Sequence, residues 1–131
     1  MKISLLVGVA LLIGAAGFSE GDLEESKKRG AEIYEEYCIT CHMGNGEGVA
    51  GVFPPLAKSD YLMAQPEKAA RAIKYGQSGE NVVNEVTYNN FMAELGLSDQ
   101  EVADVMNFIM NSWGNEQDSM ITKAYVAGVK E

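Results

Sequence analysis

Both cysteines and the single histidine of the 131-residue chain lie in five consecutive positions, Cys38-Ile-Thr-Cys41-His42. Two thiols and an imidazole at this spacing could serve as a dithiol redox pair, as part of a zinc site, or as an attachment point for haem. A dithiol oxidoreductase carries its cysteines at the start of a helix, where the dipole stabilises a thiolate, whereas Cys38 follows a helical pattern. A zinc site needs about four ligands, and the chain has no further cysteine or histidine.

Haem attachment accounts for every residue of this motif. Cysteines three positions apart can form thioethers with the two vinyl groups of one porphyrin, and the histidine that follows directly can bind the iron. The pattern C-x-x-C-H is the signature of c-type haem. The sequence therefore predicts one haem c, covalently bound through Cys38 and Cys41, with His42 as an iron ligand.

An electron carrier needs a second protein ligand, because an open iron position would bind oxygen, peroxide or other small molecules. No second histidine is present, so a methionine thioether is the natural candidate. Four methionines are poor candidates, because they adjoin His42, follow an apolar helical stripe or lie near the C-terminus: Met43, Met106, Met110 and Met120. Met63 and Met92 remain.

The elements that would position these groups are mostly helical. Helical spacing of apolar residues covers residues 22–37, 66–75 and 98–113, and part of residues 119–129. Capping-box patterns, Asp22 with Glu25 and Ser98 with Glu101, predict where two of these helices begin. A glycine-rich loop follows the haem motif, and a small β-hairpin is predicted over residues 82–88. The predicted fold class is all-α.

The first nineteen residues have the pattern of an export signal. Lys2 precedes a mostly apolar run that is short against the ~20 residues of a membrane-spanning helix. We therefore predict a signal peptide, or alternatively a retained N-terminal anchor, over residues 1–19. A domain is expected over residues 20–115 and a C-terminal extension, forming a short helix, over residues 116–131. The protein is expected to be exported, either periplasmic or anchored to the inner membrane facing the periplasm.

Composition restricts the partners. The net charge of −9 argues against nucleic acid and anionic lipid, so a membrane contact is expected only if the N-terminal segment is retained. The same charge favours a basic protein surface as partner. No nucleophile–base pair or acid–base dyad is visible in the sequence, which predicts no enzymatic activity.

Residues 27–114 resemble the class I cytochromes c. Gly30 and Tyr34 stand before the motif where that family has a glycine and an aromatic residue, and the family packs this pair against an aromatic residue that matches Phe108. Residues 41–48 fit the family turn C-H-x-x-x-G-x-G. The resemblance implies about four helices wrapped around one haem, and a hydrogen bond from His42 to the Pro54 carbonyl.

The resemblance also selects Met92 as the second iron ligand, since the family carries its axial methionine in the loop before the last long helix. One departure is that Ala93 stands where the family often has proline. The implied function is one-electron transfer between redox proteins by a His42/Met92-ligated haem. Two alternatives stay open: a haem domain with an open distal site, such as a peroxidase or ligand sensor, and a tethered electron-transfer subunit of a larger oxidoreductase.

Overall fold

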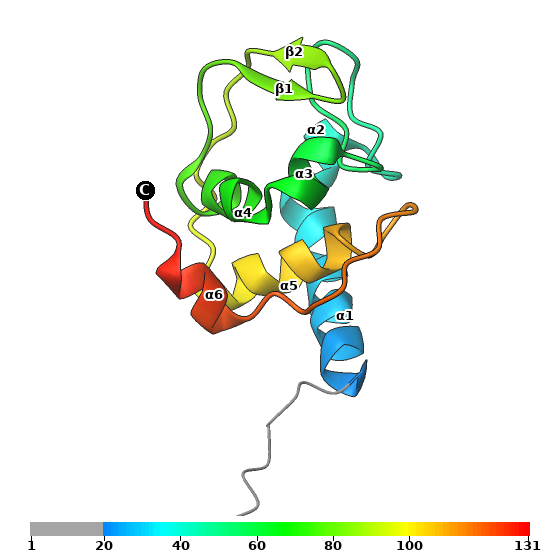
Figure 1. Ribbon diagram of the computed structural model, residues 1–131, viewed down its shortest axis with the longest axis vertical. Helices are drawn as coiled ribbons and strands as arrows, with labels where there is room; N and C mark the ends of the chain where they lie inside the picture. Colours follow the sequence, from blue (N-terminus) through cyan, green and yellow to red (C-terminus); the bar gives the residue numbers. More distant parts are fainter. Residues whose placement is uncertain (1–19) are drawn as a thin grey trace, which may run out of the picture.

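The computed structural model describes residues 20–131, which form a mostly helical molecule with one small sheet (Figure 1). In chain order the elements are α1 (Glu20–Tyr37), α2 (Ile39–His42), α3 (Asp60–Ala64), α4 (Pro66–Tyr75), β1 (Asn81–Val83), β2 (Val86–Tyr88), α5 (Asp99–Ile109) and α6 (Lys123–Gly128). The predicted helical fold with a hairpin is confirmed, and the helices beyond the expected four are the single turns α2 and α3. The predicted signal peptide or anchor lies outside the described residues. Within residues 20–131, no helix is both long and apolar enough to cross a membrane.

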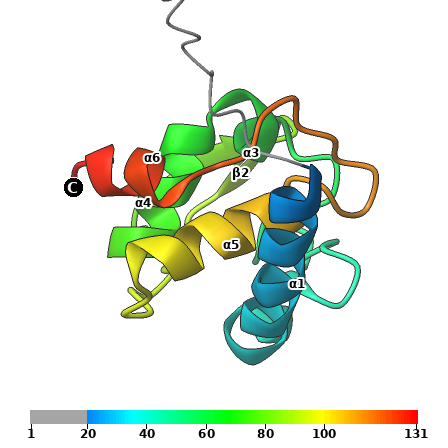
Figure 2. The ribbon, with the colours of Figure 1, turned by 90° about the horizontal axis from the view of Figure 1, so that it is seen from below.

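Helices α1 and α5 cross in close contact at Gly30 (Figure 2). A Cβ atom at this position would overlap the carbonyl oxygen of Asp104 and the Cβ of Phe108. Beside the crossing, the Tyr34 ring centroid lies 5.4 Å from that of Phe108 and 5.1 Å from that of Trp113. The predicted packing of Gly30 and Tyr34 against Phe108 is therefore confirmed, and it explains a glycine inside a helix.

Local capping signals set several helix boundaries. At the start of α5, the Ser98 side chain accepts from the Glu101 amide and the Glu101 carboxylate accepts from the Ser98 amide, as predicted. Helix α4 begins with Pro66, also as predicted. The predicted start of α1 at Asp22 is wrong, because α1 already begins at Glu20. A capping-box sequence favours one start without preventing the helix from extending by a further residue or two.

The turn between β1 and β2 attaches the hairpin to α3. Its central residues both have positive φ, 50° at Asn84 and 66° at Glu85, which is the turn geometry that matches the twist of two antiparallel strands. The Asp60 amide donates to Asn84 Oδ1 at 2.9 Å, and the Asn84 amide donates to Asp60 Oδ1 at 2.7 Å. These two bonds tie the hairpin to α3 and offset the cost of a glutamate in the left-handed region.

The C-terminal segment returns across α5 and ends beside α4 (Figure 1). Thr122 caps α6, since its hydroxyl accepts from the Tyr125 amide at 3.1 Å. Three apolar side chains of the segment are buried: Ile121, Val126 and Val129. The segment is thus part of the core.

Candidate haem site

An apolar cavity of about 350 Å³ lies among α2, α3, α4, the hairpin, and the loop that precedes α5. All four predicted site residues line it: Cys38, Cys41, His42 and Met92. Most of the other walls are apolar, including Leu62, Ile73, Val105 and Ile109. A hollow this large in a small core needs an occupant, because protein interiors are normally packed to the density of organic crystals. The cavity and its donor set fit a haem.

The two thiols and the imidazole are brought together by one tight turn. Helix α1 ends at Tyr37, and the carbonyl of Cys38 then accepts from the amides of Cys41 at 3.2 Å and His42 at 2.9 Å. Met43 has a φ of 64°, which ends the turn. The motif therefore forms a short helical platform whose three reactive side chains all line one cavity.

His42 is held in the form that can bind a metal. Its Nδ1 lies 2.9 Å from the carbonyl oxygen of Pro54, which confirms the predicted contact. A carbonyl oxygen can only accept, so Nδ1 carries the proton and the neutral ring has its lone pair on Nε2. Burial lowers the pKa of His42 despite the opposing effect of the Pro54 carbonyl. Both effects together keep the ring neutral, oriented and available as a ligand.

The loop after the motif places the Pro54 carbonyl beside the His42 ring. The Gly48 amide donates to the carbonyl of His42 at 3.0 Å, and the carbonyl of Gly46 accepts from the amides of Leu56 and Ala57. A Cβ at Gly48, whose φ is +63°, would overlap the carbonyl oxygens of Phe53 and Pro54. Glycine is therefore required at this position.

Cys38 does not have the electrostatics of a redox-active thiol. Neither cysteine is in a disulfide, and burial, with a smaller effect from Cys41, raises the pKa of Cys38 to about 11. A redox-active pair requires a thiolate, and hence a lowered pKa of one thiol. Among the described residues, no group of three or more His, Cys, Asp or Glu could hold a metal ion. The raised pKa of Cys38 favours haem attachment over the dithiol interpretation.

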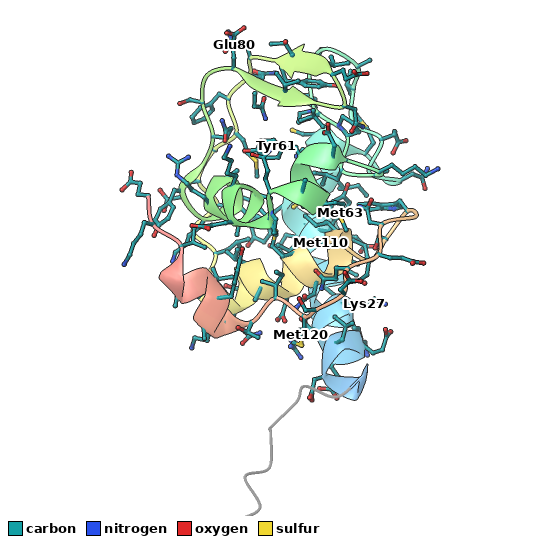
Figure 3. The ribbon with its side chains drawn as sticks, viewed as in Figure 1. Lys27, Tyr61, Met63, Glu80, Met110 and Met120 are labelled. Atoms are coloured by element: carbon teal, nitrogen blue, oxygen red, sulfur yellow. The ribbon has the colours of Figure 1, made fainter. Side chains whose placement is uncertain are left out.

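Met92 reaches the same cavity from a different side. It follows β2, in the loop that leads to α5, and in Figure 1 this loop and α2 lie on different sides of the space beneath the hairpin. Of the methionines in residues 20–131, Met92 alone lines the cavity. Met63 is half-buried on α3, and Figure 3 places Met110 at the end of α5 and Met120 farther from the hairpin. The structure thus brings Met92, and not Met63, to the predicted site.

A few polar side chains also line the cavity. Tyr88 and Asn90, which precede Met92 in the chain, line the cavity, whereas Asn89 does not. Tyr61, labelled on α3 in Figure 3, also lines it and was missed. The signal that could have revealed α3 is Ser59, whose hydroxyl accepts from the Leu62 amide at 3.1 Å.

A buried asparagine that the sequence analysis also missed supports the cavity wall. The Asn115 side chain accepts from the Lys58 amide at 2.8 Å and donates to the carbonyls of Leu56 at 2.9 Å and Ile109 at 2.8 Å. It therefore joins the loop that carries Leu56 to the end of α5. Both Leu56 and Ile109 line the cavity.

Comparison with known proteins agrees with this site. Residues 27–113 match the family described as Cytochrome c. The chain is 33% identical over 122 residues to cytochrome c-552 of Thermus thermophilus, which covers 89% of this chain and 77% of that protein. It is 35% identical over 100 residues to the cytochrome c subunit of alcohol dehydrogenase (quinone) of Gluconobacter oxydans. That match covers 71% of this chain but only 20% of the subunit.

A third relative is the gluconate 2-dehydrogenase cytochrome c subunit of Pantoea cypripedii. The identity is 29% over 111 residues, which covers 82% of this chain and 25% of that subunit. The chain therefore spans a quarter or less of the length of these two dehydrogenase subunits.

Proposed function

This chain belongs to the cytochrome c family, and on that premise we propose that it carries single electrons through one haem whose iron is bound by His42 and Met92. The family establishes an electron carrier with covalently attached haem c. Cys38 and Cys41 would hold the porphyrin through thioethers, and the haem would supply the one-electron chemistry.

One observation carries the assignment of ligands. The apolar cavity is lined by a neutral imidazole with a free Nε2 and by a single methionine thioether of the described residues. Histidine with methionine is a ligand pair of electron-transfer cytochromes c, in which sulfur stabilises the reduced iron. The apolar walls exclude water, and the Pro54 carbonyl fixes the ring orientation of His42.

Substitution of Met92 distinguishes an electron carrier from the alternative, a haem domain with an open iron position. We expect the wild type not to bind carbon monoxide readily near neutral pH, because the thioether occupies the site. Met92→Ala should bind carbon monoxide or peroxide and have a lower reduction potential, since an oxygen ligand replaces sulfur.

Met63→Ala is the matched control for this substitution. It should leave ligation and potential unchanged and lower the free energy of unfolding by about 2 kcal/mol, as a core truncation does. If Met63→Ala opens the iron and Met92→Ala does not, the assigned ligand is wrong. Free binding of carbon monoxide by the wild type would refute the carrier mechanism with a closed site.

The relatives imply redox proteins as partners, and the charge distribution supports a basic docking face on them. Asp104 does not contribute to an acidic surface, because its side chain is 2% exposed and bound to Arg29. Tyr37 lines the cavity. The carboxylates of Glu36 and Glu101 lie close enough to raise the pKa of Tyr37. Three more acidic side chains are exposed in these parts of the chain: Glu32 and Glu35 on α1, and Glu94 in the loop before α5.

Electrostatic docking predicts a specific salt dependence. Association should slow as ionic strength rises, because steering is screened beyond ~10 Å at about 0.1 M salt. The measurement is the bimolecular rate of electron transfer with a basic redox protein over a salt series. A rate that is constant or rises from low to moderate salt would contradict a basic partner face.

Similarity to dehydrogenase subunits favours a second arrangement, in which the chain is a tethered electron-transfer subunit. The same site would then serve a permanent partner, and the chain itself would still perform no catalysis. In both arrangements we propose that the protein is exported, and is either periplasmic or anchored to the inner membrane. The mass of the protein isolated from cells distinguishes them: loss of residues 1–19 supports the mobile carrier, and their retention supports the tether.

A further inference from the structure

The loop that carries Met92 lacks the stiffening proline, since Ala93 follows the methionine. Its backbone is fixed instead by an isolated antiparallel bridge to Gln77. The Gln77 amide donates to the carbonyl of Met92 at 2.9 Å, and the Met92 amide donates to the carbonyl of Gln77 at 2.8 Å. Both backbone polar groups of Met92 are therefore bonded to a residue just beyond α4.

Gly76, which follows α4 directly, lies against the same loop. Its φ is +82°, and a Cβ at this position would lie 2.8 Å from the carbonyl oxygen of Met92 and 3.0 Å from the amide nitrogen of Glu94. The end of α4 and the Met92 loop thus have no space to move toward each other. The position of the methionine depends on the position of the end of α4.

The last two residues of α4 are in turn bonded to the C-terminal segment. The Lys74 ammonium donates to the carbonyl of Val126 at 3.1 Å and pairs with Asp99 at 2.8 Å. The Tyr75 hydroxyl donates to the carbonyl of Val129 at 3.2 Å. Both acceptors are backbone carbonyls of residues with buried side chains. Val126 is completely buried, and Val129 is 3% exposed.

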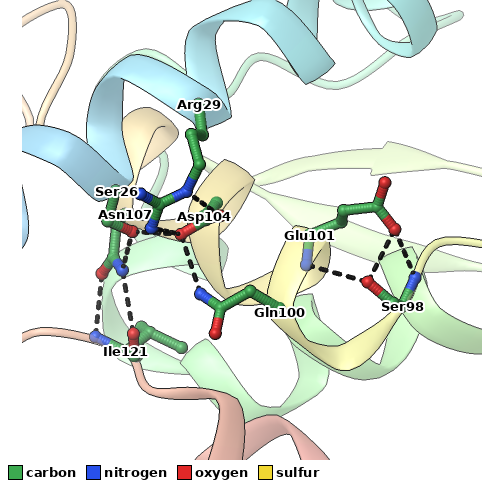
Figure 4. A network of polar contacts seen from close by, with 8 residues as sticks. All are labelled: Ser26, Arg29, Ser98, Gln100, Glu101, Asp104, Asn107 and Ile121. Atoms are coloured by element: carbon green, nitrogen blue, oxygen red, sulfur yellow. Dashed lines mark hydrogen bonds and ion pairs between the residues drawn. The ribbon is translucent and has the colours of Figure 1, made fainter.

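Other contacts also bind the C-terminal segment to the rest of the molecule. The Asn107 side chain accepts from the amide of Ile121 and donates to its carbonyl, both at 2.8 Å, which joins the segment to α5 (Figure 4). At its far end, Glu131 lines a second cavity together with Gly76, Gln77 and Phe91. Glu131 therefore lies close to Gln77 and to the loop that carries Met92.

We propose that residues 121–131, defined here as the C-terminal brace, are a positioning element for the sixth iron ligand. By bonding Lys74 and Tyr75, the brace fixes the end of α4, and the bridge from Gln77 transmits that position to Met92. The inference rests on the proposed function, in which Met92 binds the iron. It assigns to the extension an effect on ligation in addition to its effect on overall stability.

The test measures how readily an external ligand displaces Met92 in the ferric holoprotein. Imidazole is the probe, and its binding is followed by loss of the near-infrared sulfur-to-iron charge-transfer absorption. Tyr75→Phe and Lys74→Met should each raise the affinity for imidazole on the order of five-fold, the factor that one net hydrogen bond represents. Tyr125→Phe is the matched control, because it removes an exposed hydroxyl from the same segment, and it should bind imidazole with wild-type affinity.

A second control separates positioning from stability. Ser112→Ala removes the hydrogen bond that the Ser112 hydroxyl donates to the carbonyl of Phe108 at 2.6 Å, which involves no residue of the brace, and should lower the melting temperature without changing the affinity for imidazole. If Ser112→Ala raises this affinity as much as Tyr75→Phe does, or if Tyr75→Phe and Lys74→Met leave it unchanged, the inference is wrong. A wild type without the charge-transfer absorption would instead refute Met92 as the ligand, and with it the proposed function.

Discussion

The two sides of α5 are held together in different ways. On one side, Val105 and Ile109 of the helix line the apolar cavity that fits the haem. Away from it, Asp104 and Asn107 are buried in a polar network that the chain completes by itself (Figure 4). Asp104 accepts from Ser26 at 2.6 Å, from Arg29 at 2.7 and 2.9 Å, and from Gln100 at 3.0 Å.

This difference indicates what each side contributes. The network side joins α1, α5 and the C-terminal brace with directional bonds, and it needs no cofactor to be satisfied. The cavity side has apolar walls whose contacts are completed only by an occupant, so most of its free energy of burial depends on the haem. The site is therefore assembled on a scaffold whose other face is already closed.

The largest expected effect comes from removing the haem attachment, which should break the cavity side. In the double variant Cys38→Ala/Cys41→Ala the cavity has no covalent occupant, and a chain this small has little other core to rely on. We expect the helical circular dichroism to fall strongly and cooperative melting to be lost. Native-like, cooperative unfolding of this variant would show that the network side suffices for folding.

A smaller effect is expected where α1 and α5 cross. Gly30→Ala places a methyl group on the Asp104 carbonyl and on Phe108, so it should lower the free energy of unfolding by about 3 kcal/mol through overpacking. Gly128→Ala is the matched control, because a Cβ there meets open space in α6 and should change stability by less than ~1 kcal/mol. Denaturant unfolding of both holoproteins makes the comparison, and equal stabilities would contradict a close crossing.

The smallest effect concerns pH and the network side. Burial alone would raise the pKa of Asp104, but hydrogen bonds from Arg29, Ser26 and Gln100 outweigh it and lower the pKa below 3.8. The ionised carboxylate therefore contributes stability that is complete above the unfolded pKa near 3.8 and is lost as the pH falls through the folded pKa.

Asp104→Asn tests this contribution. At neutral pH it should lower the free energy of unfolding by about 2 kcal/mol, and the difference from the wild type should shrink as the pH falls to about 3. Unfolding of both holoproteins across this range is the measurement. A difference independent of pH would mean that the charge of Asp104 has no part in the network.

Local sequence patterns predicted the parts of the molecule that depend on neighbouring residues. The haem-attachment motif at residues 38–42, the capping box at Ser98, the start of α4 at Pro66 and the hairpin over residues 82–88 each follow from residues a few positions apart. The approach of α1 to α5 at Gly30 was implied by the family resemblance, and it gives a reason for a glycine that is costly inside a helix. The capping-box pattern at Asp22 gave the wrong start for α1, since a cap signal fixes a helix start only loosely.

The sequence by itself determined the chemistry: two thiols and one imidazole in a single turn specify haem attachment, because few other uses fit that spacing. It left Met63 and Met92 as alternatives until the family resemblance was considered. Only the tertiary structure decided which thioether lines the cavity with His42. It also decided that Asn115 supports the wall and that Gln77 fixes Met92. Each of these contacts joins segments distant in sequence, and their partners are chosen by packing, which no local pattern encodes.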